Sequence, residues 1–225
     1  MPVDRTTWQT LKDGLDALGV TLVAVSKTQS AEAVRALYDY GQRDFGENYV
    51  QELVQKRPLL PDDVRWHFIG HLQTNKVKLI VPFVHMVHGV DSHRLLQAID
   101  RQAAIAGRTV SCLLQMHIAR EESKFGLDEA ELEALLDATD NGRGLVNARL
   151  RGLMGMASLT DDEALVREEF RWLHGLFDRL RTGRLAGIPG FDTLSMGMSG
   201  DYRIAVAEGS GMVRIGSLLF GPRGT

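Results

Sequence analysis

The stretch Val20-Thr-Leu-Val-Ala-Val-Ser-Lys27 decides how the rest of the chain is interpreted. It is a short apolar run, rich in β-branched residues, of the kind that forms a strand buried on both faces of a parallel sheet. A polar turn and a helical pattern from about Ser30 to Tyr40 follow it, with Gly41 as a C-terminal glycine. The pattern therefore predicts that Lys27 lies at the carboxyl end of a strand, the edge at which α/β folds bind ligands.

Lys27 is a candidate reactive group, because burial of a lysine favours the neutral amine. A neutral amine at this edge can attack an aldehyde and form a Schiff base. The alternative is that Lys27 merely ends a strand and reaches solvent. Lys124, in the polar loop of residues 119–126 after a later strand, is a rival amine for the same chemistry.

Strand and helix patterns alternate along the chain without a linker or a low-complexity segment. We predict eight strands, the sixth over residues 150–157 and the eighth over residues 212–220, and a helix over about residues 4–18 before the first strand. A capping box at residues 160–163 is predicted to start the long helix after the sixth strand. The pattern predicts an α/β fold, a (β/α)8 TIM barrel with an extra N-terminal helix, formed by residues 1–225 as a single domain. An open doubly wound sheet is the alternative.

Composition narrows the class of protein. The 225 residues are 44% hydrophobic and 24% charged, with a formal net charge of −3, which argues against general attraction to nucleic acid or to an anionic membrane. No apolar run approaches the roughly 20 residues that span a bilayer, and the N-terminus lacks a secretory pattern. The single cysteine, Cys112, cannot form an internal disulfide and is expected to fill the core. We expect a cytoplasmic monomer with no nucleic-acid or membrane partner.

Glycines and serines near the end of the chain predict an anion site. Barrels often bind phosphate with the loops after the seventh and eighth strands. Ser199, Gly216 and Ser217 are the candidates, because hydroxyl and backbone N–H groups donate to an anion and glycine lets the backbone approach it. Helix caps and tight turns are the alternative. Arg214, on the eighth strand, would disfavour a proton on a pyridine nitrogen placed against it, or would form a surface ion pair.

The histidines raise the question of a metal site, because five of the seven lie between His67 and His93. His67 and His71 share strand parity, but four residues of strand separate them by roughly 13 Å. Zinc ligands must all lie about 2 Å from one ion. His85 and His88 have opposite parity and are expected to face opposite sides of a strand. We therefore predict no metal site, and we expect His71, at the start of a loop on the ligand edge, to line the pocket.

Seven short segments stand out along the chain: AVSKT (24–28), FGENYVQE (45–52), WHFIGHLQTNK (66–76), ESKFG (122–126), LMGM (153–156), LSMGMS (194–199) and VRIG (213–216). They resemble, in the same order, the motifs of the pyridoxal phosphate homeostasis proteins, which are single-domain relatives of the alanine racemase barrel. The resemblance runs from about residue 20 to about residue 222.

The resemblance implies a (β/α)8 barrel that carries pyridoxal 5′-phosphate (PLP) as an internal aldimine. Lys27 matches the Schiff-base lysine, Arg214 matches the arginine that faces the pyridine nitrogen, and Asn48 matches the pocket asparagine of the Gly-Glu-Asn motif. The positions that match the phosphate contacts are Ser199, Gly216 and Ser217.

The implied function is to hold PLP and to take part in vitamin B6 homeostasis, with PLP-accepting apo-enzymes as possible partners. A weak PLP-dependent amino-acid racemase is the alternative. Racemisation by two bases needs an acid/base group on each face of the substrate carbon, and Lys27 is the only obvious one; we do not expect the C-terminal domain that supplies a catalytic tyrosine in alanine racemases. A phosphate-sugar barrel enzyme without PLP is the second rival. Gln29, His117 and a short first helix depart from the family pattern.

Overall fold

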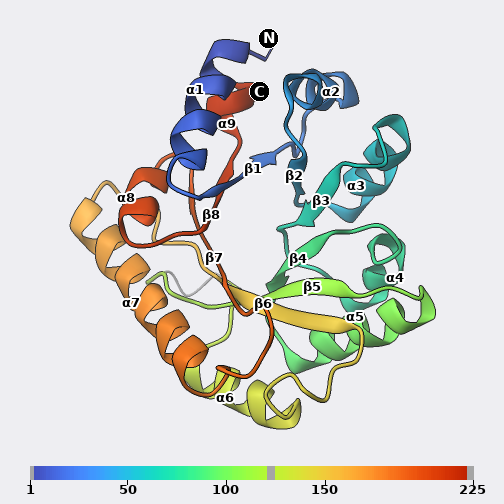
Figure 1. Cartoon of the computed structure of the whole chain (residues 1–225), viewed down its shortest axis with the longest axis vertical. Helices are drawn as coiled ribbons and strands as arrows, with labels where there is room; N and C mark the ends of the chain where they lie inside the picture. The colour runs from blue at the N-terminus through green and yellow to red at the C-terminus, as the bar shows by residue number, and fades with distance from the viewer. Residues whose placement is uncertain (1–2, 121–124, 222–225) are drawn as a thin grey trace.

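The computed structural model describes residues 3–120 and 125–221, and within them eight parallel strands close into a barrel in chain order. Figure 1 shows the helices arranged outside the strands. The predicted (β/α)8 barrel with an extra first helix is confirmed, and the open sheet is excluded because β8 pairs with β1. The strands are β1 (Thr21–Val25), β2 (Asp44–Glu47), β3 (Arg65–Phe68), β4 (Met86–Val90), β5 (Val110–Gln115), β6 (Ala148–Met154), β7 (Thr193–Met198) and β8 (Met212–Ile215). The helices are α1 (Arg5–Asp16), α2 (Ala31–Tyr40), α3 (Val50–Lys56), η1 (Arg57–Leu59), η2 (Thr74–Lys76), α4 (Val77–Ile80), α5 (His93–Ile105), α6 (Glu129–Ala138), α7 (Glu163–Thr182), α8 (Tyr202–Ala207) and α9 (Ser217–Phe220).

The alternation of side chains along β1 divides the apolar residues between two cores. Leu22 and Ala24 belong to the large core between the strands and the helices. Val23 points the other way, into a small cluster inside the barrel. Because successive side chains on a strand point to opposite faces, Lys27 has the same parity as Val23 and is directed to the barrel interior at its carboxyl mouth. The other buried members of the interior cluster are Met86, Leu113, Met154 and Met212.

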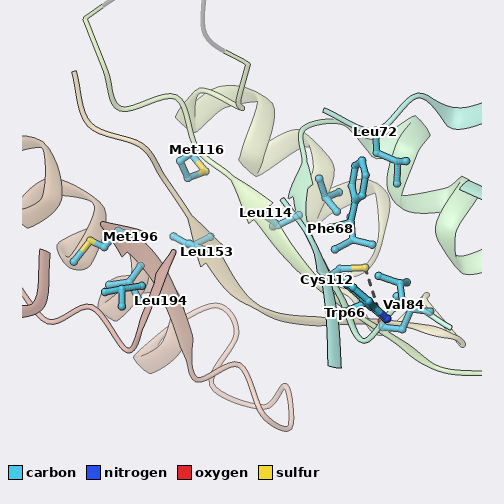
Figure 2. Packing of buried hydrophobic residues seen from close by; sticks show 14 of the residues in the cluster. Trp66, Phe68, Leu72, Val84, Cys112, Leu114, Met116, Leu153, Leu194 and Met196 are labelled. Carbon is cyan, nitrogen blue, oxygen red and sulfur yellow. Dashed lines mark hydrogen bonds between the residues drawn. The ribbon is translucent and has the colours of Figure 1, made fainter. Parts of the chain in front are cut away.

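The outer core gathers large apolar side chains from neighbouring strands. Figure 2 shows part of it, in which Trp66 and Phe68 of β3 pack beside Val84 and Cys112. The Cys112 side chain is completely buried, and burial raises the pKa of its thiol. A thiol with a raised pKa is a poor nucleophile, so the prediction that Cys112 fills the core is confirmed.

Helix α1 packs against β1, α2 and α9. The Asp4 carboxylate caps it by accepting from the backbone N–H groups of Thr6 and Thr7. Trp8 is buried and donates its indole N–H to the Gln42 side chain at 3.1 Å. In Figure 1, α1 lies beside α9. Within the part of the chain that is described, no helix combines the length and the apolar character required to cross a bilayer.

Three boundaries predicted from the pattern are wrong. β8 ends at Ile215, and residues 217–220 form α9, because a short apolar run does not distinguish a strand from a helix. α7 is capped by Asp162 and not by a box starting at Thr160, since the Asp162 carboxylate accepts from the Ala164 and Leu165 N–H groups. β6 spans residues 148–154 and so begins two residues earlier than expected.

Candidate functional site

A cavity of about 390 Å³ lies at the carboxyl mouth of the barrel, within the size range of small-molecule sites. Segments that follow β1, β2, β6, β7 and β8 contribute to its wall. Met156 and Met198 add apolar surface beside the polar groups. Six of the seven residues predicted from the sequence to bind a ligand line this one cavity: Lys27, Asn48, Ser199, Arg214, Gly216 and Ser217.

The backbone before Lys27 is held by a buried ion pair. Lys56 of α3 donates to the Glu47 carboxylate at 2.7 Å and to the Ser26 carbonyl at 2.8 Å. The Ser26 hydroxyl donates to the same Glu47 oxygen at 2.7 Å. Glu47 is fully buried, and burial raises the pKa of its carboxyl. These contacts lie on the outer side of the barrel, so they fix Ser26 while Lys27 turns to the cavity.

The backbone of Thr28, the residue after Lys27, is strained, and hydrogen bonds fix it as they fix Ser26. Thr28 has a φ of +63°, a left-handed conformation that β-branched residues rarely adopt. Its backbone N–H donates to the Glu52 carboxylate at 2.8 Å, and Lys56 donates to the same oxygen at 3.0 Å. Strained backbone persists where its surroundings over-determine it, as at ligand sites. The direction in which Lys27 leaves β1 is therefore set on both sides.

The predicted phosphate residues converge on one point. The Gly216 N–H donates to the Ser199 hydroxyl oxygen at 3.2 Å, although 17 residues separate them in sequence. Asp201 holds the loop of Ser199 by accepting from the Met198 N–H at 2.6 Å. Ser217 follows Gly216 along the same wall. Hydroxyl and N–H groups arranged in this way can donate together to a phosphate.

Arg214 is buried at the inner end of the cavity, with only 3% of its surface exposed. It donates to the Ser195 carbonyl at 2.8 Å, to the Ser195 hydroxyl at 2.7 Å and to the Gly155 carbonyl at 2.9 Å. Burial lowers the pKa of Arg214 to about 10, which still leaves the guanidinium charged at neutral pH. Since a guanidinium carries five N–H groups, these three bonds leave two for a ligand. The alternative of a surface ion pair for Arg214 is excluded.

Asn48 carries a polar atom that lacks a partner. Its Oδ1 is buried and accepts no hydrogen bond from the described residues. A buried amide oxygen without a partner is costly, so the atom is suited to a ligand that donates to it. Gly70 permits this arrangement, because a Cβ at that position would lie 2.2 Å from the Asn48 carbonyl oxygen. The cavity thus offers a lysine, an anion cradle, a buried cation and an unsatisfied amide, and these groups fit PLP.

Two sequence candidates lie elsewhere. His71 does not line the cavity: its Nδ1 contacts the Asp91 carboxylate at 3.0 Å and its ring stacks on Phe125, with 4.1 Å between centroids. A contact between His71 and a cofactor therefore remains a prediction. Lys124, the rival amine, lies outside the described residues. Sequence patterns missed Glu47, Glu52 and Lys56, since nothing in their spacing marks them as a buried network.

The central histidines pair with each other inside the barrel. His67 Nδ1 lies 2.9 Å from His88 Nε2, and His67 Nε2 lies 3.0 Å from an Asp44 carboxylate oxygen. Across residues 3–120 and 125–221, no group of three or more His, Cys, Asp and Glu side chains is placed to hold a metal ion. The contacts of His67 and His88 are those of a hydrogen-bonded network.

His88 predicts a pH dependence of folding stability. Burial, together with repulsion from the charged Arg214, holds the pKa of His88 well below 6.5. Below that pH the unfolded chain binds a proton at His88 that the folded chain does not, so stability falls as the pH falls, by up to about 1.4 kcal/mol per pH unit. Urea unfolding measures the free energy of unfolding between about pH 7 and about pH 5. That free energy is expected to fall less steeply with pH in His88→Gln than in the wild type, by up to this amount per pH unit. Equal slopes would contradict the assignment.

Comparison with known proteins places the chain in a family. The family model for the alanine racemase N-terminal domain matches residues 5–224. The pyridoxal phosphate homeostasis protein of Pseudomonas aeruginosa is 42% identical over 211 residues, which cover 93% of this chain and 87% of the relative. The protein of the same name from Escherichia coli K12 is 40% identical over 208 residues, which cover 91% and 86%. The chain belongs to the pyridoxal phosphate homeostasis protein family. The predicted family membership is confirmed.

Solved structures agree with this membership. PipY of Synechococcus elongatus, a structure described as containing bound PLP, has a TM-score of 0.86 and 36% identity, over 96% of this chain and 99% of PipY. PipY without PLP gives a TM-score of 0.89 and 37% identity, over the same shares of the two chains. Alanine racemase from Streptomyces coelicolor has a TM-score of 0.74 at 19% identity, over 99% of this chain and 60% of the racemase, which shows a common fold. The pyridoxal phosphate homeostasis family thus shares its barrel with the racemases.

Proposed function

We propose that this chain binds PLP in the cavity at the carboxyl mouth of the barrel and holds it in a form that can be released to other proteins. The single observation that carries the proposal is the cavity itself, in which Lys27 shares a wall with Arg214 and with the Ser199–Gly216 cradle. The PLP bound to PipY of Synechococcus elongatus supports it.

When bound, PLP supplies an aldehyde that condenses with an amine and a ring that withdraws electrons. Lys27 is the residue proposed to attach it. Ser199, Gly216 and Ser217 are proposed to hold its phosphate. The buried Arg214 guanidinium repels a proton from any ring nitrogen placed against it, which restrains carbanion chemistry. A site that holds PLP firmly but restrains carbanion formation suits a PLP carrier better than a racemase.

Release to PLP-dependent apo-enzymes, in the cytoplasm, is the proposed destination of the cofactor. The test is to load the protein with PLP, to remove unbound cofactor by gel filtration and to mix the product with the apo form of a PLP-dependent transaminase. The expected results are a yellow protein with about one PLP per chain and recovery of transaminase activity.

The other outcomes separate the rivals. A protein that stays colourless after loading would contradict the proposal and favour a phosphate-sugar enzyme. Turnover of any amino acid above about 1 per second, a rate typical of enzymes, would favour the racemase alternative. A yellow protein that never restores the transaminase would limit the function to storage.

A further inference from the structure

Five polar side chains from five strands form one chain of hydrogen bonds across the inside of the barrel. An Asp44 carboxylate oxygen lies 3.0 Å from His67 Nε2, and His67 Nδ1 lies 2.9 Å from His88 Nε2. His88 Nδ1 lies 3.2 Å from the Ser195 hydroxyl, which accepts from Arg214 at 2.7 Å. All five are buried, with at most 8% of any residue exposed. We call this series of five hydrogen-bonded side chains the barrel relay.

The two ends of the barrel relay fix the position of every hydrogen in it when both imidazoles are neutral. The Asp44 carboxylate can only accept, so His67 carries its hydrogen on Nε2 and accepts at Nδ1. His88 must then donate from Nε2 and accept at Nδ1. The Ser195 hydroxyl therefore donates to His88 and turns a lone pair toward Arg214, which can only donate. Each donor in the relay meets one acceptor.

The charges at the relay support this arrangement. Burial raises the pKa of the Asp44 carboxyl, but hydrogen bonds from Arg65 and His67 outweigh burial and hold that pKa well below its usual value. Asp44 therefore stays ionised. Arg65 binds both Asp44 oxygens, at 2.7 and 2.5 Å. Burial holds the pKa of His88 far below neutral. A proton on His88 would place a second buried positive charge near Arg214.

We infer that Ser195, His88, His67 and Asp44 are positioning residues for Arg214, and that they set the direction of its guanidinium at the cofactor cavity. Of the three hydrogen bonds that hold Arg214, the bond to the Ser195 hydroxyl is the one that depends on a rotatable group. The relay determines which way that group points. The part of the inference that concerns a bound cofactor rests on the proposed function. The positions of the histidine hydrogens can be measured without any cofactor.

The relay also connects the two mouths of the barrel. Asp44, Arg65, His67 and His85 line a second cavity of about 550 Å³ at the amino-terminal mouth, and the Arg65 side chain is 49% exposed there. An unbroken series of hydrogen bonds therefore runs from the Asp44 carboxylate at this mouth to Arg214 at the other.

Other ionisable groups face the relay and have to be accounted for in any titration. His85, before β4, lies with its ring centroid 5.3 Å from that of His67, and burial lowers the pKa of His85 to about 4. Arg108 acts electrostatically on His85, and Asp201 acts on Arg214. His85 contacts His67 by its ring and stands outside the chain of relay hydrogen bonds, so His85→Gln is a matched control.

The first test uses ¹⁵N-labelled protein without cofactor. Long-range ¹⁵N–¹H spectra of the imidazoles are expected to show a hydrogen on His67 Nε2, toward Asp44, and the His88 hydrogen on Nε2, toward His67. His88→Gln assigns the His88 signals by removing them. Hydrogen on His88 Nδ1 would overturn the inference, whether or not the protein binds PLP.

The second test uses the PLP-loaded protein and follows its absorption spectrum against pH. Arg214→Gln serves as the reference for a lost guanidinium. Ser195→Ala and His88→Leu are expected to shift the apparent pKa of the chromophore in the same direction as Arg214→Gln, by about one unit. His88→Gln, whose amide can both donate and accept, is expected to restore most of the wild-type titration, and His85→Gln to match the wild type.

The outcomes separate the inference from the proposed function. Wild-type titration in both Ser195→Ala and His88→Leu would overturn the inference while PLP binding stands. If His88→Leu does not fold, Ser195→Ala, which removes one oxygen atom, decides alone. If the wild type binds no PLP, the proposed function fails and the tautomer spectra decide the inference.

Discussion

Replacement of Lys27 by alanine is expected to abolish the yellow colour of the PLP-loaded protein and all cofactor that borohydride can fix to the chain. The reason is that Lys27 is the amine directed into the cavity from β1, and the Ser199–Gly216 cradle cannot form a covalent bond. Residual PLP is expected to be lost on gel filtration. Absorption spectra before and after filtration measure the effect.

Lys124→Ala is the matched control for Lys27→Ala, because Lys124 is the rival amine predicted from the sequence. The control is expected to keep its colour and its borohydride-fixed cofactor. A Lys27→Ala protein that remains yellow while Lys124→Ala turns colourless would move the attachment site to Lys124.

Replacement of Lys56 by methionine is expected to reduce the free energy of unfolding by about 3 to 5 kcal/mol, the usual cost of leaving one member of a buried ion pair alone. The Lys56 and Glu47 side chains are 9% and 0% exposed, and their charged atoms are 2.7 Å apart. A second Glu47 oxygen, Oε2, has no partner among the described residues, so removal of Lys56 leaves that carboxylate almost unsupported. Urea unfolding at neutral pH measures the loss.

Arg35→Met tests whether burial, and not the ion pair as such, causes the loss. Arg35 and Asp39 of α2 are 2.8 Å apart but 54% and 53% exposed. Exposed pairs contribute about 0 to 1 kcal/mol, so this variant is expected to be nearly as stable as the wild type. The double variant Glu47→Gln with Lys56→Met should recover much of the lost stability. A similar small loss in Lys56→Met and Arg35→Met would contradict the account of the buried pair.

Local pattern was enough to predict the barrel, and pattern together with the family resemblance pointed to six residues that line one cavity. The β-branched run that ends in Lys27 marks β1, and the alternation of side chains fixes which way Lys27 points. The convergence of Ser199 and Gly216 follows from the closed barrel, in which β7 and β8 are neighbours. The extent of the domain, predicted as residues 1–225, remains a prediction.

The parts that pattern could not predict depend on contacts across the closed barrel. The contact between His67 and His88 was not predicted from the sequence, because it depends on the register in which β3 and β4 pair. Ser195 joins them from a strand 107 residues later than His88. The end of β8 was missed for a local reason, since a four-residue helix such as α9 is too short to show a period.

The measurement that tests the central claim most directly is peptide mapping of the wild-type protein after loading with PLP and reduction with borohydride. The account predicts that mass spectrometry finds the added mass on one peptide, and that fragmentation assigns it to Lys27. Added mass on Lys124 alone, or on no lysine, would contradict it.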